Sequence, residues 1–136
     1  MAACWLLKTE PEDYSYDDLE RDKKTVWDGV SNNLALKHLR AMRRGDVALI
    51  YHTGDARRWV GWADIVSDPY PDPKGNDPKQ VVVDVTPKRR LDRPVTLDAI
   101  KARKELADFD LVRLPRLSVM PVTERHLKLL RALANP

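Results

Sequence analysis

The middle of the chain holds three apolar segments with strand-like composition, at residues 47–52, 60–66 and 81–85. Apolar residues occupy both faces of the first segment, so we expect a strand that is covered on both sides. Helical patterns are short and lie mostly outside this region, and they do not alternate strictly with the strands. This order disfavours a doubly wound parallel sheet. It favours an α+β fold, in which a small mixed or antiparallel β-barrel has helices at its sides.

Shorter elements are expected on either side of these strands. Ser15 and Thr123 are good N-caps for helices, because their hydroxyls can accept bonds from free backbone N–H groups. Four prolines in residues 68–79 predict a loop. The further strands are expected at residues 4–8 and 117–122, and the helical segments at 16–21, 33–42, 96–103, 106–109 and after Thr123. Because the sequence shows no repeat and no low-complexity linker, we expect residues 1–136 to form one domain.

Composition excludes several classes of protein. No apolar run approaches the roughly 20 residues of a membrane helix, and the N-terminal apolar run is too short for a signal peptide. The single cysteine, Cys4, excludes an intrachain disulfide and favours an intracellular, cytoplasmic location. Since Cys4 lies within an apolar strand, its thiol is expected to be buried and inert. We expect a monomer with no membrane partner.

Enzyme signatures are scarce. The five glycines stand alone, so the phosphate-binding and dinucleotide-binding motifs are absent. The three histidines are far apart and no Cys-x-x-Cys pair occurs, so we expect neither a metal nor a cofactor. His52, at a strand end, is a candidate general base that Glu10 or Asp28 would orient. A histidine hydrogen-bonded at the edge of the core is the simpler interpretation.

The net charge of +3 is unevenly distributed along the chain. Residues 1–30 hold eight acids and four bases, whereas the remainder holds twenty bases and thirteen acids. Such a distribution can orient a polyanion onto one side of a protein. Lys37, Arg57 and Arg58 are candidates for contacts with a nucleic-acid backbone. A solvated surface of mixed charge is the alternative interpretation.

Tryptophan is frequent and phenylalanine is rare. The chain has four tryptophans, at positions 5, 27, 59 and 62, and one phenylalanine. Trp offers a wide π-face and a polar N–H, and polar side chains stand near these indoles at predicted strand ends. This combination suits a planar heterocycle that is held by stacking on its faces and by Asn, Ser or Thr at its edges. Alternatively, the tryptophans fill a small core.

Five segments, in order, resemble the EVE domain family of the PUA-like superfamily. They are residues 5–11, 26–32, 45–53, 70–73 and 116–122. The resemblance implies a PUA-like β-barrel of five to six strands flanked by helices, without catalytic activity. It also implies a pocket that accepts a modified base flipped out of a nucleic acid. Relatives are linked to 5-modified cytosines such as 5-methylcytosine, so DNA is implied more strongly than RNA.

The resemblance also assigns roles to individual residues. It gives base stacking to Trp27 and edge contacts to the side chains of Asn32, Thr9 and Ser118. The remaining pocket and rim residues that it implies are Tyr51, His52, Thr53, Leu117, Lys8 and Arg116. Many relatives carry arginine where Ser31 stands here, which removes an anion partner but leaves a helix N-terminus that attracts anions.

Three alternatives stay open at this point. The first is a reader of modified bases in RNA, which would contact the 2′-hydroxyl. The second is a small nucleotide-acting enzyme that uses His52 as its base. The third is a protein-interaction module that presents the acidic segment 10–22.

Overall fold

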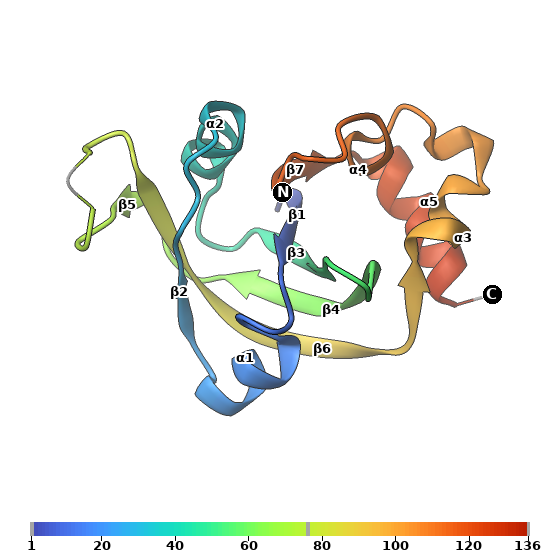
Figure 1. The fold of residues 1–136 in the computed structure, drawn as a ribbon, viewed down its shortest axis with the longest axis horizontal. Helices are drawn as coiled ribbons and strands as arrows, with labels where there is room; N and C mark the ends of the chain where they lie inside the picture. The colour runs from blue at the N-terminus through green and yellow to red at the C-terminus, as the bar shows by residue number, and fades with distance from the viewer. Residues whose placement is uncertain (1, 76, 136) are drawn as a thin grey trace.

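A curved, mixed β-sheet runs through the whole molecule (Figure 1). The computed structural model describes residues 2–75 and 77–135. The strands are β1 (Cys4–Thr9), β2 (Thr25–Trp27), β3 (Val47–His52), β4 (Arg58–Ile65), β5 (Tyr70–Pro71), β6 (Val81–Thr96) and β7 (Val119–Val122). Their order is β2-β6-β4-β3-β1-β7, and β5 pairs with β6 outside this path. Only the β1–β3 pair is parallel within the described ranges. The sheet curls into a half-barrel flanked by helices, which confirms the expected α+β class.

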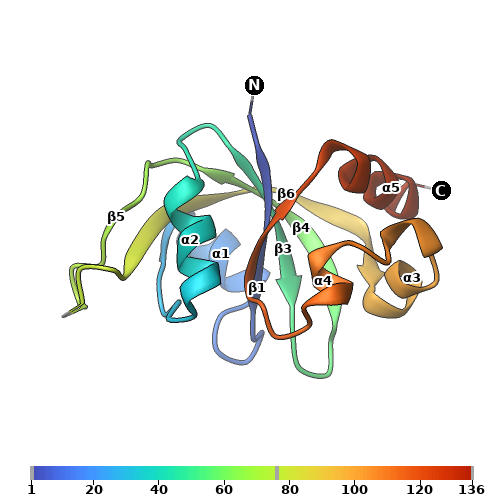
Figure 2. The same cartoon turned by 90° about the horizontal axis from the view of Figure 1, so that it is seen from above.

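The helices lie at the sides of this half-barrel. They are α1 (Tyr16–Asp22), α2 (Asn33–Ala41), α3 (Leu97–Lys101), the 3₁₀ turn η1 (Lys104–Leu106), α4 (Asp110–Arg113) and α5 (Glu124–Ala134). Figure 2 shows α1 and α2 on one side of β1 and β7, with α3, α4 and α5 on the other. Ser15 and Thr123 cap α1 and α5 as the sequence predicts, since each hydroxyl accepts a backbone N–H of the first turn. None of the helices in the described ranges combines the length and apolar composition needed to cross a bilayer.

Several predicted boundaries differ from the structure. Strand β6 does not stop at Val85 but continues to Thr96, because residues 85–96 pair with β4 across two register shifts. Strand β2 was not predicted, and β5 lies inside the region predicted to be a loop. Asn76 of that region lies outside the described residues. The last strand begins at Val119 rather than at residue 117, and a helix, α4, begins just after the predicted segment 106–109 ends.

Three of the four tryptophans, at positions 5, 27 and 59, are buried in the core, and two of these use their N–H groups inside it. Trp59 is fully buried and donates its Nε1–H to the Gly61 carbonyl at 2.9 Å. Trp5 donates to the carboxylate of the buried Asp46 at 3.0 Å. Cys4 is buried as predicted, and burial raises the pKa of its thiol to about 12. For these two tryptophans, filling the core is the correct interpretation.

Helix α1 packs closely on the sheet at Gly61. A Cβ at this position would stand 2.7 Å from two ring atoms of Tyr16 and 3.1 Å from the Arg89 carbonyl oxygen. The Tyr16 hydroxyl donates to the Trp62 carbonyl at 2.7 Å, across the same contact. Only glycine leaves room for the Tyr16 ring at this position, so Gly61 allows α1 to pack against the sheet. This contact holds the segment between β1 and β2 against the end of the sheet.

Candidate functional site

A hollow of about 410 Å³ opens between the end of β1 and the strand β2. Lys8, Thr9 and Ser118 line one wall, and residues 25–30 line the opposite wall. Asp13 and Tyr14, from the segment that leads into α1, also line it. Among the described residues, β2 and β7 are the two edge strands of the sheet, so the hollow lies where the half-barrel remains open.

Trp27 forms the aromatic part of this hollow and is held rigidly. Its backbone pairs with Val83 of β6, and the side chain of Tyr14 meets its ring edge-on, with centroids 6.5 Å apart. The residue is 7% exposed. Its indole nitrogen is not hydrogen-bonded to any of the described residues and is not sealed from solvent. The ring is therefore fixed by packing, while its N–H stays free to donate to a ligand.

The opposite wall carries polar groups at strand ends. The amide of Lys8 donates to the carbonyl of Ser118 at 2.9 Å and so joins β1 to the start of β7. The hydroxyl of Ser118 makes no hydrogen bond within residues 2–75 and 77–135, so it can both donate and accept. The hydroxyl of Thr9 donates to the Tyr14 carbonyl at 2.7 Å, which leaves its oxygen as an acceptor.

Lys8 is the cation at the rim, and protein contacts hold its side chain. Its Nζ donates to the Pro115 carbonyl at 2.8 Å and lies 5.8 Å from the centroid of the Tyr51 ring. Burial lowers the pKa of Lys8. Asp13 and Asp28 supply carboxylates to the same lining. The hollow thus presents an indole, hydroxyls, one positioned ammonium and two carboxylates.

The predicted residues at the end of β3 lie elsewhere and are engaged in structural contacts. Tyr51 is buried beneath Lys8. The Nε2 of His52 accepts a hydrogen bond from the backbone N–H of Tyr16 at 3.0 Å. Burial, and to a smaller extent the positive charge of Arg90, lowers the pKa of His52. The Thr53 hydroxyl donates to the Glu10 carboxylate at 3.3 Å. His52 therefore anchors the start of α1, and Glu10 contacts Thr53 rather than His52.

Three more predicted residues do not line the hollow. The side chain of Asn32 accepts the Ala35 backbone N–H at 3.0 Å and caps α2. Leu117 is buried in the core, and Arg116 is exposed one residue before it. Conversely, Tyr14 lines the hollow but was not predicted to do so, because its position depends on the return of the chain after β1. No group of acidic, histidine or cysteine side chains in the described part of the chain is arranged to hold a metal ion.

Comparison with known proteins places this geometry in a family. The sequence model of the EVE domain matches residues 3–133. The chain belongs to the EVE domain family. It is 33% identical to thymocyte nuclear protein 1 of Rattus norvegicus, over 90% of this chain and 69% of that protein. The family resemblance found in the five sequence segments is thereby confirmed.

Solved structures of similar proteins share the fold of this EVE domain. The NMR structure of Rpa0253 from Rhodopseudomonas palustris has a TM-score of 0.92 and 41% identity, covering 98% of this chain and 93% of that one. The structure of human THYN1 protein in complex with 5-methylcytosine-containing DNA has a TM-score of 0.90 and 28% identity, covering 99% of both chains.

The cations expected to contact a nucleic-acid backbone are exposed in this EVE domain. Lys37 lies on the outer surface of α2. Arg57 and Arg58 lie at the start of β4, around a smaller hollow of about 210 Å³ that also includes Asp55 and Asp98. These three cations are on elements other than those that line the Trp27 hollow.

Proposed function

We propose that this EVE domain is a non-enzymatic reader that binds DNA and accepts a flipped, 5-modified cytosine in the hollow beside Trp27. The hollow itself carries the proposal: the packed indole of Trp27 and the hydroxyl of Ser118, which has no partner among the described residues, line one space that opens to solvent. The likeness to human THYN1 protein, solved with 5-methylcytosine-containing DNA, supports the choice of ligand.

The free-energy cost of flipping a base out of the duplex and the gain from stacking it in the hollow are similar in size. Taking a base out of the stack costs a few kcal/mol, and stacking on an aromatic side chain returns about 1–3 kcal/mol. The Ser118 hydroxyl and the Thr9 oxygen are available to the edges of the base. A base that leaves these groups unpaired loses about 1–3 kcal/mol for each buried group, and this gives selectivity. The hollow falls within the ordinary size range of ligand sites.

Contacts with the DNA backbone would come from residues other than those that recognise the base. Lys8 lines the hollow, and Arg116 is exposed two residues before Ser118. Lys37, Arg57 and Arg58 are exposed farther away and would add contacts that depend on salt and not on sequence. The engaged Nε2 of His52 removes support from the enzymatic alternative, because a general base needs that lone pair free.

A variant that fills the hollow tests the proposal without removing a core residue. Ser118→Phe places a ring in the space that the base would occupy, and Ala102→Phe adds the same ring at an exposed position outside the hollow. Fluorescence anisotropy would measure binding to duplexes carrying one plain, one 5-methylated or one 5-hydroxymethylated cytosine. We expect the natural protein and Ala102→Phe to prefer a modified duplex and Ser118→Phe to lose that preference.

The same assay identifies the outcomes that would contradict the proposal. Equal affinity of the natural protein for all three duplexes would show that it does not recognise the cytosine modification. A preference that survives in Ser118→Phe would place recognition outside the hollow. Competition by a ribo-oligonucleotide of the same sequence, stronger than by its deoxyribo counterpart, would replace DNA by RNA as the ligand.

A further inference from the structure

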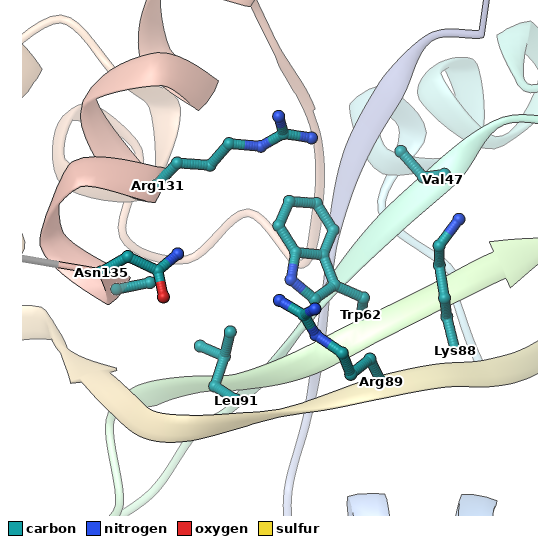
Figure 3. Close-up of a pocket in the computed structure, with 8 residues that line it drawn as sticks. Val47, Trp62, Lys88, Arg89, Leu91, Arg131 and Asn135 are labelled. Atoms are coloured by element: carbon teal, nitrogen blue, oxygen red, sulfur yellow. The ribbon is translucent and has the colours of Figure 1, made fainter.

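A second hollow, of about 540 Å³, lies between α5 and the sheet and shares no lining residue with the first (Figure 3). Its charged and aromatic residues come from three elements: Trp62 from β4, Lys88 and Arg89 from β6, and Arg131 from α5. The side chain of Leu91 adds an apolar surface. Neither the sequence patterns nor the proposed function assigns a role to this cluster.

The positive charge of the hollow is largely uncompensated. Within the described ranges, neither Arg89 nor Arg131 forms a salt bridge, and only Lys88 pairs with a carboxylate, that of Asp64 at 3.5 Å. By contrast, the neighbouring Arg90 contacts α1 and is neutralised by two acidic side chains of that helix. Two free guanidinium groups and one partly paired ammonium around a concave space attract an anion.

Trp62 adds a flat aromatic surface to these cations. The ring is partly exposed, and the buried Trp59 meets it edge-on, with centroids 5.1 Å apart. The guanidinium carbon of Arg131 lies 5.3 Å from its centroid. Figure 3 shows the indole between Arg131, which extends from α5, and Arg89, which rises from β6. A simple anion would need only the cations, whereas a ligand with both a phosphate and a planar ring would use the indole as well.

We propose that this second hollow is a nucleotide-binding site, in which the base contacts Trp62 and the phosphate contacts Arg89 and Arg131. The nucleotide is either a free mononucleotide or one residue of a nucleic-acid strand, since both present the same ring and phosphate. The volume falls within the ordinary range of ligand sites. The site is independent of modified-base recognition, because the two hollows have separate linings.

Indole N–H resonances of the ¹⁵N-labelled protein report on each hollow separately. Trp62→Phe identifies the Trp62 signal, and Trp27 reports on the other site. The probes are deoxyadenosine monophosphate, deoxyadenosine, inorganic phosphate and a short single-stranded oligodeoxyadenylate, all at one ionic strength. We expect a saturable shift of the Trp62 signal, and about tenfold weaker binding in Arg89→Gln and in Arg131→Gln. The matched control Arg93→Gln removes an exposed arginine of β6 outside the hollow and leaves binding unchanged.

Each outcome decides the proposal. A shift with the mononucleotide identifies a free nucleotide as ligand, and a shift with the oligonucleotide alone identifies a strand. The absence of a Trp62 shift with either probe overturns the proposal. So does a response to inorganic phosphate as strong as that to the mononucleotide, or an equal loss of binding in Arg93→Gln. Since the Trp27 signal is read in the same spectra, these results leave the proposed function of the first hollow undisturbed.

Discussion

Replacing Trp27 by leucine tests the stacking contribution while keeping an apolar side chain in the wall of the hollow. The indole is 7% exposed, so most of its surface packs against the protein and leucine retains part of that packing. We expect the substitution to lower the free energy of unfolding by about 0.5–3 kcal/mol. A domain of ordinary stability, about 5–15 kcal/mol, tolerates this loss and stays folded.

The loss of binding can be calculated from the stacking energy. Stacking of one base contributes about 1–3 kcal/mol, which corresponds to roughly a 5- to 150-fold increase in the Kd for a 5-methylcytosine duplex. Fluorescence anisotropy measures this Kd for the natural protein and for Trp27→Leu. The same duplex with an abasic site at the target position completes a thermodynamic cycle, because it offers no base to stack.

The cycle separates a lost contact from a damaged protein. We expect both proteins to bind the abasic duplex with the same affinity, so the whole loss appears only when the base is present. An equal loss on the abasic and the methylated duplex would refute the argument, because the effect of Trp27 would then not depend on the base.

Two further predictions concern the fold around α1. Gly61→Ala places a Cβ 2.7 Å from the Tyr16 ring, so we expect it to lower the free energy of unfolding by about 1–3 kcal/mol. Urea unfolding measures this change, and an unchanged urea midpoint would contradict the close packing of α1 on Gly61. His52 has a lowered pKa and accepts the Tyr16 N–H, so its neutral form stabilises the folded state. The free energy of unfolding should be highest above pH 6.5 and decrease as the pH falls below it, and His52→Gln should reduce this decrease; a slope unaffected by His52→Gln would contradict this role.

The sequence predicted those elements whose pattern is set by burial on both faces. Strand β3 has the predicted bounds, Val47–His52, because apolar residues on both of its faces have no other suitable environment. The second half of β6 was missed because Lys88, Arg89 and Arg90 are exposed and carry no apolar alternation. Pairing with β4 maintains that strand, and such a tertiary contact leaves no local pattern.

Prediction of the candidate site was limited by competing uses of the same side chains. One hollow brings together residues from three separate parts of the sequence: Lys8 with Thr9, Trp27, and Ser118. Asn32 caps α2 with the amide that was expected to contact a base, and a sequence does not distinguish these two uses of an asparagine. The second hollow was not predicted, because its cations come from a strand and a helix that meet only in the folded chain.

The central claim is that a 5-modified cytosine leaves the duplex and lies against Trp27. A duplex carrying 5-iodocytosine at the target position tests it directly, since long-wavelength ultraviolet light cross-links the C5 carbon to a side chain in contact, preferentially an aromatic one. Mass spectrometry of the digested complex should find the cross-link on the lining of the first hollow, with Trp27 or Tyr14 as the modified residue. A cross-link confined to residues outside that hollow would contradict the account.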